Sequence, residues 1–152
     1  MIALPTAADT KQLGRRLSRL LRAGDLVVLS GPLGAGKTAL VQGIGAGMGV
    51  TGRIASPTFV LARVHPAEQV GRPTLVHVDA YRLGSLAEID DLDLDVDVQS
   101  SVTVVEWGAG LAERLAESWL SIELARTADS EERTATVTAA GGDWATRLAQ
   151  LG

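Results

Sequence analysis

The segment 31–38 constrains the fold of this chain more than any other part of its sequence. It reads Gly-Pro-Leu-Gly-Ala-Gly-Lys-Thr and fits the spacing G-x-x-x-x-G-K-T. An apolar run at 25–30 precedes it and helix-forming residues at 37–48 follow it. In this setting backbone N–H groups can point at phosphates, Lys37 can reach the β and γ oxygens, and the Thr38 hydroxyl can ligate Mg²⁺. The sequence therefore predicts a phosphate-binding loop between a strand and a helix.

Hydrophobic patterns predict further elements on both sides of this loop. Strands are predicted over 25–30, 59–64, 74–79, 101–106, 120–125 and 134–139, and helices over 10–22, 37–48, 85–92, 111–117 and 143–151. The strands 59–64 and 74–79 are expected to form a hairpin, and four glycines from 43 to 49 are expected to weaken the end of the second helix. The fold class predicted is α/β: one P-loop NTPase domain over 1–152, with a mainly parallel central sheet, flanking helices and antiparallel additions.

Composition limits the classes of protein to which the chain can belong. With 152 residues, 46% of them hydrophobic, it has room for one core. No apolar run approaches the length of about 20 that spans a membrane, and cysteines and a signal-peptide pattern are absent, so a cytoplasmic location is expected. The net charge of −4 and 3% aromatic content argue against a broad nucleic-acid surface, so any contact with RNA is expected to be indirect.

Two charged segments need separate interpretation. The cations of 11–22 fit either a solvated helix face or a docking patch; they are Lys11, Arg15, Arg16, Arg19 and Arg22. The alternating acids of 91–98 are similar to a calcium loop, but that motif needs Gly at its sixth position and Glu at its twelfth, where this chain has Val96 and Val102. Calcium is therefore rejected in favour of an acidic edge or a partner-facing patch.

The rest of the chain predicts which nucleotide base is bound and which residues ligate the metal. Guanine is normally read by an Asn-Lys-x-Asp element, and this chain contains no Asn, so adenine is favoured. A phosphate loop needs a carboxylate at the end of a neighbouring strand to hold Mg²⁺, directly or through water. Asp79 and Glu106 each end an apolar run, and the carboxyl ends of parallel strands form the ligand crevice. Both acids are candidates.

Other residues near these acids leave alternatives open. His77 fits a half-buried strand position better than a catalyst, because Asp79 explains the chemistry better. Arg82 fits either a pair with Asp79 or a phosphate contact, and Trp107 fits packing better than the lining of a site. A γ-phosphate-sensing switch or a Pro-restricted turn fits Ser56, Pro57, Thr58 and Phe59.

Several motifs, taken together, resemble one family. GPLGAGKT at 31–38, SPTF at 56–59, HVDAYRL at 77–83 and VEW at 105–107 resemble, in this order, the TsaE (YjeE) family of small bacterial P-loop ATPases. The run 10–14 is similar to the family's T-x-x-L-G near the base and ribose. Two departures are Pro32, where the family often has an acidic residue, and the Asp-rich segment 88–97.

The resemblance implies an ATPase with Mg²⁺ and ATP or ADP as its ligands. It puts Lys37 on the phosphates, Thr38 and Glu106 at Mg²⁺, Asp79 beside them in hydrolysis, and 56–59 in a switch. Nucleotide contacts are expected from Thr10, Leu33, Gly34, Ala35, Gly36, Lys37, Thr38 and Ala39. The implied partners are TsaB and TsaD subunits that make threonylcarbamoyladenosine on tRNA, with tRNA met only indirectly and no membrane. The alternatives are a small-metabolite kinase, which would need an Arg-rich lid, and a nucleotide-gated interaction module.

Overall fold

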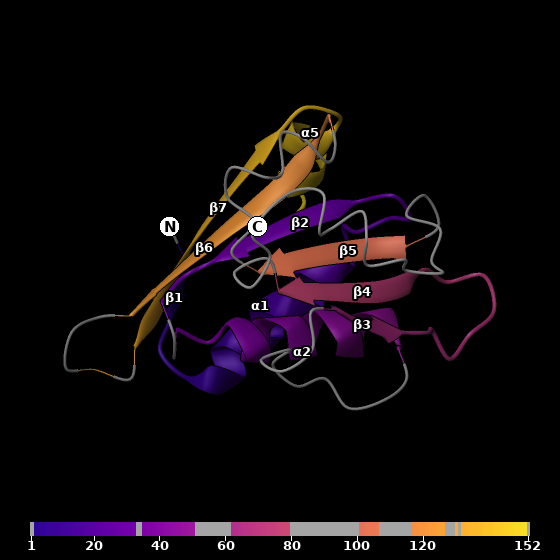
Figure 1. Cartoon of the computed structure of the whole chain (residues 1–152). Helices are drawn as coiled ribbons and strands as arrows, with labels where there is room; N and C mark the ends of the chain where they lie inside the picture. Colours follow the sequence, from indigo (N-terminus) through magenta and orange to yellow (C-terminus); the bar gives the residue numbers. More distant parts are fainter. Residues whose placement is uncertain are drawn as a thin grey trace.

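The chain folds into one mixed β-sheet with helices packed against it (Figure 1). A computed structural model describes residues 2–32, 35–50, 62–79, 101–106, 117–126, 130 and 132–151, with the backbone alone at 62, 63 and 79. The elements are β1 (Ile2–Leu4), α1 (Ala7–Ser18), β2 (Leu26–Ser30), α2 (Lys37–Met48), β3 (Ala62–His65), β4 (Thr74–Asp79), β5 (Ser101–Glu106), β6 (Trp119–Arg126), β7 (Arg133–Ala140) and α5 (Trp144–Leu148).

The sheet has seven strands in the order β1-β7-β6-β2-β5-β4-β3. Its centre is parallel, because β2 pairs in parallel with β5 and with β6, and β5 pairs in parallel with β4. Both edges are antiparallel: β7 joins β6 and β1 on one side, and β3 joins β4 on the other. The predicted α/β fold, with a mainly parallel centre and antiparallel additions, is confirmed, as is the predicted hairpin.

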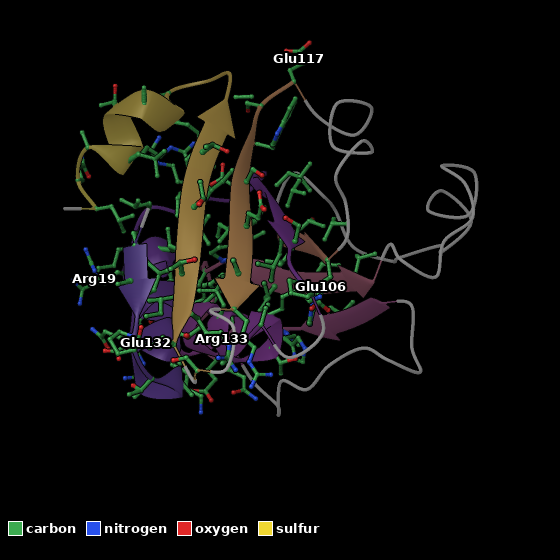
Figure 2. The ribbon with its side chains drawn as sticks, turned by 90° about the vertical axis from the view of Figure 1, so that its left-hand side faces the viewer. Arg19, Glu106, Glu117, Glu132 and Arg133 are labelled. Atoms are coloured by element: carbon green, nitrogen blue, oxygen red, sulfur yellow. The ribbon has the colours of Figure 1, made fainter. Side chains whose placement is uncertain are left out.

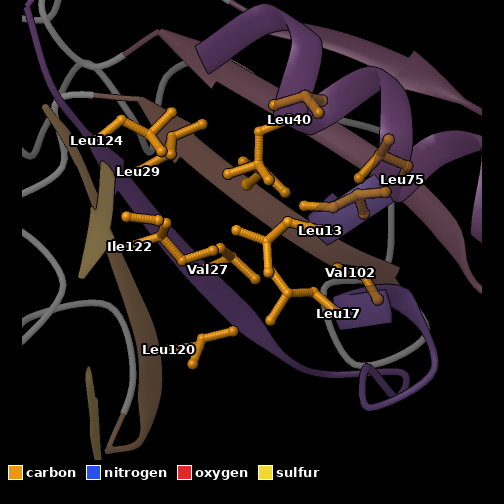
Figure 3. Close-up of a cluster of buried hydrophobic side chains, with 14 of the residues drawn as sticks. Leu13, Leu17, Val27, Leu29, Leu40, Leu75, Val102, Leu120, Ile122 and Leu124 are labelled. Carbon is orange, nitrogen blue, oxygen red and sulfur yellow. The ribbon is translucent and has the colours of Figure 1, made fainter. Parts of the chain in front are cut away.

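The core lies between one face of the sheet and the two long helices. Side chains of a strand alternate between the faces of a sheet, and in β2 Val27 and Leu29 point into this core. Leu13 and Leu17 of α1 and Leu40 of α2 meet them from the helix side, as Figure 3 shows. This packing holds the start of α2 against the carboxyl ends of the parallel strands.

Glycines allow α1 and α2 to lie unusually close together. A Cβ atom added at Gly43 would lie 2.8 Å from the carbonyl carbon of Lys11, and one added at Gly14 would lie 2.8 Å from the backbone nitrogen of Ile44. Helix α2 runs without a break to Met48, and the missing side chain at Gly43 makes room for α1. The helices therefore cross nearly backbone to backbone. That the four glycines weaken the end of this helix stays a prediction.

The ends of the first helix differ from the predicted range 10–22. Helix α1 begins one turn earlier because Thr6 and Asp9 form a capping box, with the Asp9 carboxylate accepting from the Thr6 backbone N–H at 2.9 Å. It ends at Ser18, after which the N–H of Leu20 donates to the Leu17 carbonyl over three residues, at 2.9 Å. The predicted helix is therefore confirmed and its boundaries are corrected.

The remaining elements follow the predictions with smaller changes. Strand β1 was missed, because it has only three residues and its partner β7 is distant in sequence. Helix α5 is five residues long, whereas nine were predicted at 143–151. It is followed by hydrogen bonds of the 3₁₀ type, from the N–H of Gln150 to the Arg147 carbonyl and from the N–H of Leu151 to the Leu148 carbonyl. The predicted helix 85–92 lies outside the described residues, as do 59–61 of one predicted strand and all of the predicted helix 111–117 except Glu117, which is not helical. In the described part of the chain no helix is long and apolar enough to cross a bilayer.

The cations of residues 11–22 divide into two groups. Arg22 pairs with Asp143 at 3.0 Å and Arg16 donates to the Leu151 carbonyl, so these two guanidinium groups join α1 and its C-terminal extension to the end of the chain. Three others, Lys11, Arg15 and Arg19, are exposed, and Arg19 extends outward into solvent in Figure 2.

Candidate functional site

The loop between β2 and α2 has the backbone geometry that its glycines allow. Gly31, directly after β2, has a φ of +147°, and Gly36, directly before α2, has a φ of +99°. Other residue types rarely adopt such values. Between them the N–H of Ala35 donates to the Pro32 carbonyl at 3.0 Å, while Leu33 and Gly34 lie outside the described residues. The loop thus turns sharply from the strand into the first residue of α2.

Lys37 is the first residue of α2 and lies across this loop. Its Nζ donates to the Gly31 carbonyl at 2.6 Å, and the residue is 8% exposed. Thr38 and Ala39, the next two predicted ligands, are half-buried. An ammonium group held over a loop of backbone amides offers positive charge where a phosphate would bind.

The amino end of α2 is suited to an anion. The first N–H groups of a helix lack partners within the helix, and its dipole is positive there. In α2 the N-cap residue is Gly36, which supplies no side-chain cap, and the first turn contains no acidic residue. The N-cap residue itself therefore offers no side-chain acceptor to the amide groups of this turn, and a phosphate can take that role.

Thr10 lies beside the same end of the loop. It is buried within α1, and a Cβ atom added at Gly36 would lie 3.6 Å from the Thr10 Cγ2. The structure thus brings Thr10, the first residue of the motif at 10–14, next to the loop that is predicted to bind phosphate.

The two candidate acids end neighbouring strands in register. Asp79 of β4 pairs with Glu106 of β5, and Glu106 in turn pairs with Leu29 of β2. Leu29 comes two residues before Gly31, so Glu106 stands beside the point where β2 enters the loop. Figure 2 shows Glu106 beside these strand ends. The side chain of Asp79 lies outside what the structure describes, as do all four residues of 56–59 and the residues Arg82 and Trp107.

A buried histidine contacts Glu106. The Nε2 atom of His77 lies 3.0 Å from Glu106 Oε2, and the two side chains are 0% and 5% exposed. His77 precedes Asp79 by two residues on β4, and its neighbour across the sheet is Val104. The sequence favoured a half-buried strand position for His77, and this degree of burial was wrong, because the residue is fully buried. Its contact with Glu106 was not predicted, since it depends on the register of β4 against β5, which no local sequence signal specifies.

The donor set fits Mg²⁺. Magnesium prefers oxygen ligands and is often held by one or two carboxylates together with phosphate oxygens and waters. Thr38 supplies a hydroxyl at the start of α2, and Glu106 supplies a carboxylate from the end of β5. Within the described residues no cluster of three or more His, Cys, Asp or Glu could hold a metal alone. These residues fit a metal that binds together with the phosphates.

Comparison with known proteins identifies the family. The family model described as threonylcarbamoyl adenosine biosynthesis protein TsaE matches residues 4–135. A tRNA threonylcarbamoyladenosine biosynthesis protein TsaE of Streptomyces coelicolor is 60% identical over 141 residues, covering 90% of this chain and 94% of that protein. The protein of the same name from Mycobacterium bovis is 55% identical over 139 residues, covering 88% of this chain and 83% of that one.

A solved structure agrees with this assignment. The crystal structure of YdiB from Bacillus subtilis superimposes with a TM-score of 0.76 at 28% sequence identity, covering 98% of this chain and 90% of that one. This likeness supports the α/β fold described above. The chain therefore belongs to the TsaE family of threonylcarbamoyl adenosine biosynthesis proteins.

Proposed function

We propose that this chain is a Mg²⁺-dependent ATPase that supports the threonylcarbamoyl transferase complex in the modification of tRNA. The observation that carries the proposal is a juxtaposition: Lys37 and Thr38 open α2 directly after the loop, and Glu106 ends the strand that pairs with β2 beside that loop. The ammonium group of Lys37, the hydroxyl of Thr38 and the carboxylate of Glu106 thus lie near the loop whose backbone amides would bind a phosphate.

Binding of ATP would use the loop and the first turn of α2. The backbone N–H groups of 33–39 would surround the β-phosphate, and Lys37 would turn its Nζ from the Gly31 carbonyl to the β and γ oxygens. Thr10, beside Gly36, would approach the ribose and base from α1. The absence of Asn from the sequence supports adenine, since the usual guanine-reading element cannot be built.

Hydrolysis would depend on position and charge more than on covalent chemistry. Thr38 and Glu106 would hold Mg²⁺, which neutralises charge on the phosphate oxygens when bound. Asp79, in register with Glu106, would orient the attacking water from the next strand. Lys37 would stabilise the negative charge that develops on the phosphate oxygens as the bond between the γ-phosphorus and the bridging oxygen of the ADP leaving group breaks. The segment 56–59 would sense the γ-phosphate as a switch.

The partners would be TsaB and TsaD type subunits in the cytoplasm, with tRNA met only through them. The net charge of −4 supports an indirect contact with tRNA, because direct binding to the tRNA backbone normally requires an excess of clustered cations. The curated relatives are named as tRNA threonylcarbamoyladenosine biosynthesis proteins, which supports the same pathway for this chain.

The test of the proposal is ATP hydrolysis by the isolated chain and by the chain mixed with the TsaB and TsaD pair of the same cell. Lys37→Ala is expected to reduce the rate by about 100-fold or more, because it removes a charged donor from the transition state. Lys11→Ala is a matched control, since Lys11 is the only other lysine and is exposed on α1. The control should hydrolyse ATP at the wild-type rate.

The outcomes separate the parts of the proposal. Hydrolysis that the TsaB and TsaD pair stimulates, and that Lys37→Ala abolishes, supports the whole of it. Hydrolysis undiminished in Lys37→Ala would overturn the site. An active chain that neither associates with the pair nor responds to it would overturn the assignment of partners and leave the ATPase standing.

A further inference from the structure

We propose that His77 is a positioning residue, which holds the Glu106 carboxylate in the orientation required for Mg²⁺. This inference rests on the proposed function, because Glu106 matters for hydrolysis only if the chain is an ATPase. It goes beyond the motif itself, in which Asp79 accounts for the chemistry of the same strand.

The two side chains meet because their strands are adjacent, parallel and in fixed register. Residues 77 and 79 of β4 stand opposite 104 and 106 of β5. By alternation, His77 shares a sheet face with Leu75, and Glu106 shares that face with Val102 and Val104. Leu75, Val102 and Val104 belong to the core on which α1 and α2 pack. The pair therefore faces the helix whose first turn carries Lys37 and Thr38.

Burial makes this hydrogen bond difficult for water to replace. His77 is 0% exposed and the Glu106 side chain is 5% exposed, so water has little access to replace a lost hydrogen bond. A carboxylate that ligates a metal only accepts hydrogen bonds, so in that role of Glu106 the Nε2 atom, 3.0 Å from Oε2, is the donor. The contact fixes one oxygen of a side chain that otherwise rotates about three bonds.

The second ring nitrogen fixes the position of the proton. His77 Nδ1 is buried and has no hydrogen-bond partner among the described residues. In the neutral ring, a proton on Nδ1 would leave a buried donor unpaired among the described residues and would turn the Nε2 lone pair toward a carboxylate oxygen. The structure thus assigns the proton to Nε2, and His77 acts as a directed donor to Glu106.

A donor of this kind commonly orients a carboxylate that ligates a metal, and its loss costs about 10–100-fold in metal affinity or activity. The test compares His77→Leu, which removes the donor, with His77→Gln, whose side-chain amide nitrogen reaches nearly the position of Nε2. The concentration of Mg²⁺ that gives half-maximal ATP hydrolysis is expected to rise by about 10-fold or more in the Leu variant. It should return close to the wild-type value in the Gln variant.

Two further measurements distinguish positioning from a structural role. The Kd for ATP in the presence of EDTA is expected to stay within about twofold of the wild-type value in both variants, because the phosphate loop is intact. Nitrogen NMR of the imidazole rings should find the proton of His77 on Nε2, and the signal is easily assigned because the chain has only two histidines, His65 and His77. Glu106→Ala should change that signal and leave the His65 signal unchanged.

The results that overturn the inference are distinct from failure of the proposed function. A wild-type chain that hydrolyses ATP, with a Leu variant of unchanged Mg²⁺ requirement, overturns the role of His77 and leaves the ATPase standing. A ring protonated on Nδ1 alone, with no proton on Nε2, overturns it as well, even if the Leu variant does not fold. A wild-type chain that hydrolyses no ATP at any Mg²⁺ concentration overturns both.

Discussion

The close crossing of α1 and α2 predicts that Gly43→Ala destabilises the protein, although alanine is the better helix former. The added Cβ would lie 2.8 Å from the Lys11 carbonyl carbon and closer still to its oxygen. Carbon atoms in favourable contact lie about 3.5–4.0 Å apart, so the helices would have to separate by about 1 Å. The obstacle is backbone on both sides, so no side chain can rotate away to relieve it.

The expected loss follows from two opposing effects. Overpacking of a tight core costs up to about 3 kcal/mol, and replacing Gly by Ala within a helix returns about 1 kcal/mol. The net loss is about 2 kcal/mol in the free energy of unfolding. For a chain of 152 residues this corresponds to a fall in Tm of about 4–8 °C. Thr10 lies on α1, beside Gly36. A displacement of α1 away from α2 should therefore also weaken ATP binding.

Urea unfolding followed by circular dichroism measures this loss, with an unchanged m-value as the sign that only stability has changed. Ala46→Gly is the matched control, since Ala46 is exposed on the same helix. It should lose about 1 kcal/mol by helix propensity alone. A Gly43→Ala variant as stable as the wild type, or more stable, would refute the explanation of the glycine in terms of close helix packing.

Three further substitutions test the loop, a helix cap and an ion pair. Gly31→Ala should cost about 3 kcal/mol and abolish ATP binding, because its φ is +147° and its Cβ would lie 2.5 Å from the Leu124 carbonyl oxygen; wild-type stability in urea would contradict this. Thr6→Ala should cost about 1 kcal/mol through loss of the capping box, and a change below a few tenths would show that the cap is not needed. The hydrogen bond from Arg147 lowers the pKa of Asp143 below its ordinary 3.8, so the stability it contributes is complete above that pH and is lost as the pH falls through the lowered pKa. Asp143→Asn should therefore flatten the decrease of Tm in this acidic range, and an unchanged acid dependence would be the contrary result.

The parts of the fold that are local in sequence could be predicted. The loop with its strand and helix is set by consecutive residues, and α2 was predicted with its observed bounds, Lys37–Met48. The runs that form β4 and β5 were likewise predicted at Thr74–Asp79 and Ser101–Glu106. In each case the apolar pattern of the segment itself carries the signal.

What could not be predicted depends on contacts between distant segments. The short edge strand β1 exists because β7 pairs with it, and Gly43 is required because α1 lies against it. The bond between His77 and Glu106 follows from the order and register of two strands, which the sequence of neither strand encodes alone. The early start of α1 is different, because the pattern of Thr6 and Asp9 was present in the sequence and was overlooked.

The central claim is that ATP hydrolysis at this loop sustains the modification of tRNA. Its most direct test is the formation of threonylcarbamoyladenosine on tRNA over many turnovers. The mixture contains TsaB, TsaD, ATP, Mg²⁺, this chain and a TsaC-type enzyme, which the family resemblance implies as the source of the threonylcarbamoyl adenylate that TsaB and TsaD consume. The wild-type chain is predicted to sustain the reaction. The Lys37→Ala variant is added at equal concentration after circular dichroism has shown that it is folded, and with it the reaction is predicted to stop after about one turnover per complex. Modification that continues at the wild-type rate with Lys37→Ala would contradict the claim.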